Sequence, residues 1–169
     1  MPITPFNSTP DNARVWVFGA SQPILGDDAV RLLGRVDAFL RGWHAHGEPV
    51  VGSRDWRYDR FLLIAADEEA TGVSGCSIDM LYRSLREMEN EVGASLLDGS
   101  LVFHRDPSGA VLSVDRTRFR AMVAAGDVVG TTIVFDNTVG TMGAVRQGEW
   151  ERRFSGSWQE RAFRKARSG

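Results

Sequence analysis

The sequence has a single lysine, and this scarcity excludes several kinds of chemistry. The other 19 of its 20 basic residues are arginine. A phosphate-binding loop of the G-x-x-x-x-G-K-[ST] type needs a lysine after its last glycine, and no such string occurs here. Lys165 lies in the string RAFRKARSG, which is a poor setting for the buried amine of a Schiff-base enzyme. The sequence therefore excludes a P-loop ATPase and argues against lysine-based covalent catalysis.

Cysteine is equally scarce, since Cys76 is the only one in the chain. A single thiol cannot form an internal disulfide, which agrees with a reducing compartment. No apolar run approaches the roughly 18 residues of a membrane-spanning helix, and no leader-like segment is recognisable. The formal net charge of -2 gives no overall attraction to nucleic acid or anionic lipid. We therefore expect a cytoplasmic protein without a membrane partner.

Length and composition favour one domain over residues 1–169, because 169 residues with 43% hydrophobic content can bury a sizeable core. Residues 1–12 contain three prolines and predict an extended arm. Residues 151–169 form a basic tail with six basic and two acidic residues, interleaved with Phe154, Trp158 and Phe163. This tail could contact an acidic partner or RNA, but such tails more often pack their aromatic rings on the domain.

Hydrophobic periodicity predicts alternating strands and helices. Strands are expected where β-branched and aromatic residues cluster, and helices where apolar residues recur every three or four positions. The expected strands span residues 14–20, 50–58, 60–66, 101–104, 111–114 and 131–135, and the expected helices run from a cap at Asp27 or Asp28 to Trp43, from Gly75 to about Leu97, and over 116–125.

This order of elements predicts an α+β fold. The order β-α-β-β-α-β matches a split βαβ core, in which helices cover one face of a mainly antiparallel sheet, and the remaining elements form a C-terminal extension. Strands 50–58 and 60–66 should form a hairpin, and the second is apolar enough to lie centrally. Asp79 and Arg83 should form an i, i+4 ion pair on the second helix.

The candidate site lies in the string RFLLIAADEEATGVSGCSID, where a buried strand leads through a glycine-containing loop into a helix. Cys76 falls in the first turn of that helix, where amide donors and the helix dipole favour a thiolate or a bound anion. Ser74, Gly75 and Ser77 could form a backbone nest for a phosphate or carboxylate. The alternative is structural, with Cys76 as a small buried apolar residue and Ser74 or Ser77 as the helix cap.

A nucleophilic Cys76 would need a base, and His46 in the string WHAHG is the best candidate. His46 could instead cap the first helix, and Asp67 could order the loop that follows its strand. The spacing of Asp67, Glu68 and the histidines matches no metal-specific pattern, so we expect neither a metal nor a cofactor.

Several strings resemble those of a family of short, uncharacterised bacterial proteins: FNSTPDNARVW, WHAHGEPV, FLLIAADE, SGCSID, TTIVFDNTVGT and SWQERAF. Members are sometimes described as ABC transporter ATPases, an activity that the missing lysine argues against. The chain departs from the family pattern at His44, Asp136 and Met142. The resemblance implies that the marked positions are His46, Asp67, Glu68, Cys76, Ser77, Asp79, Asn137, Trp158 and Arg161.

These observations favour a binding module that holds a small anionic ligand, or an acidic protein partner, at the 74–77 helix start. Asp79 would belong to this site, and Arg83 or Arg161 would help to neutralise the anion. The alternative is a cysteine-dependent hydrolase or acyltransferase, in which Cys76 is the nucleophile, His46 the base, and Asp67 the third member.

Overall fold

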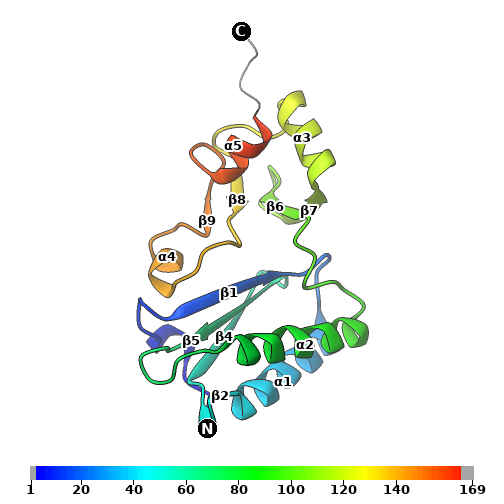
Figure 1. Ribbon diagram of the computed structural model, residues 1–169. Coiled ribbons are helices and arrows are strands. Elements are labelled where there is room, and N and C mark those ends of the chain that lie inside the picture. Colours follow the sequence, from blue (N-terminus) through cyan, green and yellow to red (C-terminus); the bar gives the residue numbers. More distant parts are fainter. Residues whose placement is uncertain (1–2, 165–169) are drawn as a thin grey trace.

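The molecule is built on a three-stranded antiparallel sheet that the sequence correctly predicts to be a split βαβ unit (Figure 1). The computed structural model describes residues 3–164, so Lys165 lies outside the described part. Strand β5 lies between β1 and β4 and pairs antiparallel with both, so β1 and β4 run parallel. The expected hairpin of β4 and β5 is thereby confirmed. The bounds are Arg14–Gly19 for β1, Gly52–Arg57 for β4, Phe61–Ala66 for β5, and Gly26–Gly42 for the connecting helix α1.

Strand β5 is buried along its whole length because both faces of this sheet are covered. Leu62, Ile64 and Ala66 pack on the side of helices α1 and α2 (Gly75–Val92). The alternate residues Phe61, Leu63 and Ala65 point to the opposite side. Side chains of a strand alternate between faces, so a continuous apolar run is the expected signature of a central strand covered on both sides.

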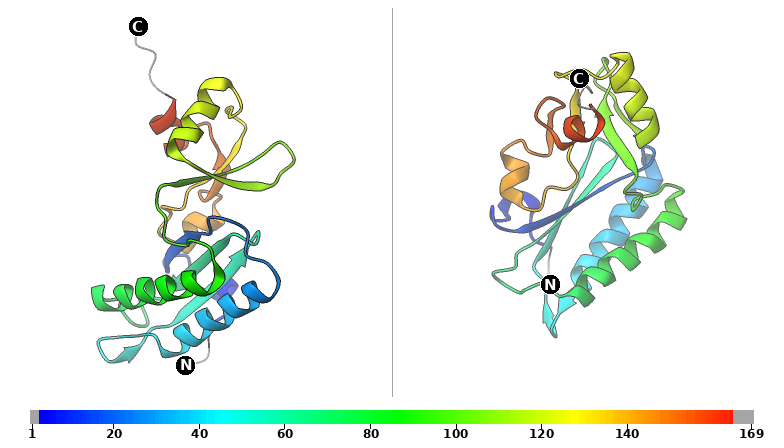
Figure 2. Two further views of the ribbon diagram at one scale, coloured as in Figure 1. Left: turned by 90° about the vertical axis from the view of Figure 1, so that its right-hand side faces the viewer. Right: turned by 45° about the horizontal axis from the view of Figure 1, so that its top comes forward.

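A second, four-stranded sheet covers the face opposite the two helices (Figure 2). This arrangement corrects the expectation of one sheet with an extension, because the strand after α2 joins the second sheet. Aromatic residues from both parts, including Phe61, Phe103 and Trp150, form one cluster between the sheets. The second sheet has the order β7-β6-β8-β9, with β6 at Leu101–Arg105, β7 at Val111–Asp115, β8 at Ile133–Phe135 and β9 at Glu151–Arg153.

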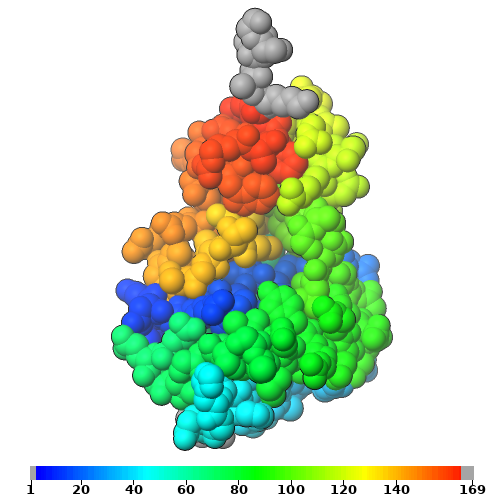
Figure 3. Space-filling model, viewed as in Figure 1, coloured from blue at the N-terminus to red at the C-terminus, as the bar shows by residue number. Residues whose placement is uncertain are grey.

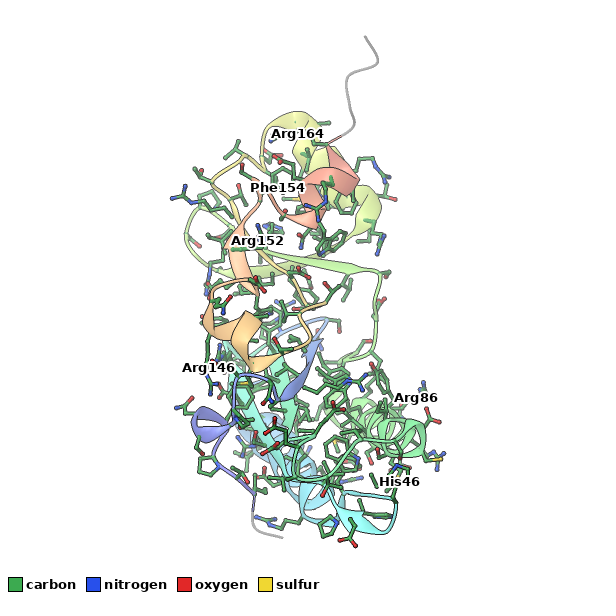
Figure 4. All side chains as sticks on the ribbon, turned by 60° about the vertical axis from the view of Figure 1, so that its left-hand side comes forward. His46, Arg86, Arg146, Arg152, Phe154 and Arg164 are labelled. Atoms are coloured by element: carbon green, nitrogen blue, oxygen red, sulfur yellow. The ribbon has the colours of Figure 1, made fainter. Side chains whose placement is uncertain are left out.

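The basic tail belongs to this second part of the fold. Helices α3 (Arg116–Ala125) and α5 (Trp158–Phe163) contact each other and share a small core with the sheet. Phe154 and Phe163 are buried in that core, so the described part of the tail packs its aromatic rings on the domain. Figure 4 places Arg152, Phe154 and Arg164 together in this region.

Several element boundaries differ from the prediction, most clearly those of the two long helices. Leu25, not an aspartate, is the N-cap of α1, and Asp27 and Asp28 lie in its first turn. This helix ends at Gly42, and the next residues form a small hairpin of β2 (His44–Ala45) and β3 (Glu48–Pro49). Helix α2 ends at Val92, because Gly93 adopts the left-handed conformation that terminates helices (φ 67°).

The N-terminal arm is also more ordered than the predicted extended segment. A short 3-10 helix, η1 (Phe6–Ser8), buries Phe6 against the core. Arg146, at the end of helix α4 (Met142–Arg146), donates hydrogen bonds to Asp11 and to the backbone carbonyls of Asn7 and Thr9. A distant arginine therefore fixes a segment whose own sequence has little tendency to fold. Within residues 3–164, no helix is long and apolar enough to cross a membrane.

Gly34 offers a simple test of helix α1. A Cβ atom added there would meet no heavy atom within 4 Å, and the residue lies in the helix interior. Because alanine favours a helix over glycine, we expect Gly34→Ala to stabilise the protein by about 0.5–1 kcal/mol. Urea denaturation of both proteins would measure this. A loss of stability would show that α1 is not packed as described.

Candidate functional site

Helix α2 begins with a capping box, which confirms the predicted start of the helix. The Ser77 amide donates to the Ser74 hydroxyl (3.1 Å), and the Ser74 amide donates to the Ser77 hydroxyl (2.8 Å). Ser77 is buried, and its backbone carbonyl accepts a hydrogen bond from the Trp43 indole at 2.8 Å. The two serines thus serve the helix itself, and only the amides of Gly75 and Cys76 are left as open donors in this turn.

Cys76 is exposed at this helix start, which excludes its alternative interpretation as a buried apolar residue. His46 is also exposed and occupies the β2–β3 turn, where it and Gly47 both have positive φ values (53° and 77°). It is therefore a turn residue and not the C-cap of α1. This hairpin contacts α2, but within residues 3–164 no hydrogen bond joins His46 to Cys76 or Asp67.

The acidic residues after β5 have structural partners. The Asp67 carboxylate accepts a hydrogen bond from the Glu69 amide at 3.1 Å, so it orders its own loop. Glu68 lies 3.6 Å from the Arg14 guanidinium, and Glu69 accepts from the Asn12 amide group at 2.7 Å. Among the described residues, no group of three or more His, Cys, Asp and Glu side chains could hold a metal ion.

Of the charged residues assigned to the helix start, Asp79 and Arg83 lie on α2, but Arg161 does not. Asp79 and Arg83 are both exposed on α2, and the expected ion pair between them is not formed. Arg161 lies on α5, at the other end of the molecule from the start of α2 (Figure 1). Its guanidinium donates to the Gly156 carbonyl at 3.3 Å. The start of α2 therefore lacks Arg161, one of the two cations that were predicted to complete the anion site.

A more developed site lies elsewhere, between the two sheets. Two cavities, of about 260 and 240 Å³, share five lining residues and together form a groove along β1. In Figure 3 the blue surface of β1 is visible between the green α2 and the yellow and orange segments of the second part. We call this the inter-sheet groove; the shared residues are Val17, Phe18, Tyr82, Asn137 and Thr138.

Two neighbouring residues that line this groove each carry a buried polar atom without a hydrogen-bond partner. These atoms are the indole Nε1 of Trp158, a donor, and the side-chain Oε1 of Gln159, an acceptor. Gln159 is only 1% exposed, and its Nε2 donates to the Phe135 carbonyl at 3.0 Å, which fixes the amide orientation. A buried polar group without a partner typically costs about 1–3 kcal/mol, so such atoms are uncommon in a folded core.

Charged side chains stand at the rim of the groove. Arg116 is exposed and lies 5.9 Å from the centre of the Trp158 ring, and no carboxylate within residues 3–164 forms an ion pair with it. Asp98 accepts hydrogen bonds from the hydroxyl and the amide of Ser100, which lower the pKa of its carboxyl group. The rim therefore offers one free cation and one carboxylate that stays ionised at neutral pH.

No protein-family model, curated protein or solved structure matches this chain. The resemblance to short bacterial proteins stays a prediction. Two of the positions that it implies, Asn137 and Trp158, do line the inter-sheet groove. Reasoning from the residues missed this site because its walls come from segments that are distant in the sequence. The one local signal was the SWQE string, in which Ser157 caps α5 and places Trp158 and Gln159 in its first turn.

His104 is a further buried residue whose position was not predicted from the sequence. It is 2% exposed, its Nδ1 lies 3.3 Å from the Arg105 carbonyl, and its Nε2 has no partner. Burial lowers the pKa of this ring, an effect opposed more weakly by the Arg105 backbone and the charge of Asp106. The folded protein therefore favours the neutral imidazole.

The lowered pKa of His104 makes the stability of the protein depend on pH between pH 7.5 and pH 5. Below the usual histidine pKa of about 6.5, the unfolded chain binds a proton that folded His104 resists, so stability should fall as pH drops. Between pH 7.5 and pH 5, we expect the melting temperature of His104→Phe to fall by a few degrees less than that of the wild type. A difference of 1 kcal/mol in the free energy of unfolding corresponds to about 2–4 °C for a chain of this size. The exposed His46, changed to Asn, is the control. Equal pH dependence in the wild type and His104→Phe would contradict the assignment.

Proposed function

We propose that this protein is a binding module for a small ligand that carries an anionic group, and that the ligand binds in the inter-sheet groove. The observation that supports this most strongly is the pair of unpartnered buried atoms, Trp158 Nε1 and Gln159 Oε1, in two residues that line the groove. A ligand that accepts from the indole and donates to the amide oxygen would satisfy both. Ligand sites are typically concave, mainly apolar, and fitted with a few such polar groups.

Arg116 supports the anionic character of the ligand. Its guanidinium is exposed, lies next to Trp158 and has no competing carboxylate within ion-pair distance in the described chain. A guanidinium can bind a carboxylate or phosphate through two parallel hydrogen bonds. The apolar floor, formed by Val17, Phe18 and Tyr82, would contact the body of the ligand.

The start of α2 is a less well supported candidate site for the same ligand. The capping box uses the Ser74 and Ser77 side chains, and Arg161 lies far away. We therefore place the ligand in the groove and not at the predicted helix start.

Thermal-shift measurements with nucleotides, sugar phosphates and carboxylates test the proposal. A ligand at 100 times its Kd stabilises a folded protein by about 2.7 kcal/mol, which corresponds to a rise of about 5–10 °C for a chain of this size. Arg116→Gln and Trp158→Phe should each weaken binding about tenfold or more.

Matched controls separate binding from general effects on the fold. Arg118→Gln removes a neighbouring exposed arginine of α3. Trp56→Phe removes another buried, unpartnered indole N–H, on β4 and outside the groove. Both control variants should bind as the wild type does. Absence of stabilisation by all three ligand classes, or equal losses in test and control variants, would contradict the proposal.

The cysteine-enzyme alternative depends on Cys76. Because this thiol is exposed, we expect iodoacetamide to label it fully in the native protein, without denaturant. The rate of labelling between pH 6 and pH 9, compared in the wild type and His46→Asn, would then test the alternative. A pH profile that does not change on loss of His46 would exclude the proposed nucleophile and base pair. If the native protein resists labelling, the described position of Cys76 is wrong.

A further inference from the structure

A second cavity, separate from the inter-sheet groove, lies in the other part of the molecule. Its volume is about 630 Å³, within the range of known small-molecule sites, and it shares no lining residue with the groove. The turn between β6 and β7, the end of α3 and the loop after α3 enclose it. Gly126, with φ 79°, reverses the chain after α3 and brings that loop back over the helix. We call this space the His104 cavity.

The walls of the His104 cavity are largely apolar. Leu112, Met122, Val129 and Ile133 contribute to the lining. Leu112 is 40% exposed and Val129 is 46% exposed. An apolar ligand that covered these side chains would gain free energy from the apolar area removed from water.

His104 is the buried, unpartnered polar residue among those that line this cavity. On strand β6 it lies on the same face as Val102, on the side of α3, and its ring packs against Phe119 with 5.8 Å between ring centres. The Nδ1 atom lies 3.3 Å from the Arg105 carbonyl, which favours the tautomer with the proton on Nδ1. The neutral ring then presents Nε2 as a hydrogen-bond acceptor, and this buried atom has no partner.

We infer that the His104 cavity binds a mainly apolar small molecule that carries one hydroxyl group, with the hydroxyl donating to His104 Nε2. An anion is disfavoured, because Asp106 and Asp127 lie in the lining and the one lining arginine, Arg105, already forms an ion pair with Glu151, whereas Arg116 of the groove has no such partner among the described residues. The ligand therefore differs in chemical class from the anionic ligand of the groove. A phenol with a fused-ring body has both required features.

A matched pair of probes tests this inference: 1-naphthol, which has the hydroxyl, and 1-methoxynaphthalene, which has the same rings but no donor. NMR of protein with ¹³C-labelled methionine methyl groups reports on the cavity through Met122, whose resonance is assigned with Met122→Leu. We expect 1-naphthol to shift the Met122 signal and to bind about tenfold or more tightly than the ether. Trp56→Phe, on β4 and outside the cavity, should leave both affinities unchanged.

His104→Phe keeps an aromatic ring beside Phe119 but removes the acceptor. In this variant the two probes should bind with equal affinity, whereas in His46→Asn the preference for 1-naphthol should persist. If His104→Phe does not fold, ¹⁵N NMR of the wild-type ring decides, because 1-naphthol should shift the His104 Nε2 resonance and the ether should not. The inference is overturned if neither probe shifts Met122, if the probes bind equally to the wild type, or if His104→Phe retains the preference.

Discussion

Replacing Arg60 by methionine is expected to destabilise the protein by about 2–4 kcal/mol, because this buried cation joins the two sheets. Arg60 is 4% exposed and precedes β5. It donates hydrogen bonds to the carbonyls of Ala20 and Ser21 after β1, and to the Val111 carbonyl and the Ser113 hydroxyl on β7. Methionine fills similar space but leaves these acceptors without their donor.

The electrostatics of Arg60 explain why the site tolerates a charge. Burial lowers the pKa of Arg60, but its hydrogen bonds to four acceptors compensate for the hydration that the guanidinium loses. Arg60→Lys keeps the charge but cannot reach all four acceptors, so we expect an intermediate loss. Arg31→Met, which removes an exposed arginine paired with Asp28, should change stability by less than about 0.5 kcal/mol. Urea denaturation of all four proteins provides the measurement, and equal stabilities of Arg60→Met and Arg31→Met would contradict the proposed junction.

Replacing Gly19 by alanine is expected to destabilise the protein by about 1–3 kcal/mol through overpacking. A Cβ atom at this position, the last residue of β1, would lie 2.4 Å from Cζ of the buried Phe103 ring. Both residues line the inter-sheet groove. Displacement of the ring should therefore also change the affinity of any ligand that binds there.

Gly99 is the matched control, because it lines the same groove but a Cβ atom there meets nothing within 4 Å. We expect Gly99→Ala to leave stability within about 0.5 kcal/mol of the wild type. A double-mutant cycle of Gly19→Ala with Phe103→Leu identifies the cause. If the clash with Phe103 is responsible, the second change should recover part of the loss, and strictly additive losses would argue against it.

Much of the fold could be predicted because the signals were local. Helix α3 and strands β5, β6 and β7 were expected within one residue of their observed bounds. The Ser74 cap was readable because a capping box depends on residues three apart. Helix α2 was nevertheless predicted too long, since apolar spacing continues past Gly93, whose backbone conformation ends the helix.

The candidate site was predicted less well, and the reason is also physical. The start of α2 was placed correctly, and Cys76 is exposed there as the binding hypothesis required. Arg161, one of the two cations that were to complete the site, was not brought to it, because it is held on α5. No rule of spacing relates residue 161 to residue 76, so only the path of the chain could decide whether they meet.

The amino-acid sequence by itself determined the α+β class, the split βαβ unit and the two-sided burial of β5, because periodicity and turn residues act over a few positions. Only the tertiary structure decided that the strand after α2 starts a second sheet and that aromatic packing joins the two sheets. It also decided where the groove and the His104 cavity lie. Such cavities arise from the packing of distant segments, and the local pattern of residues does not specify how those segments meet.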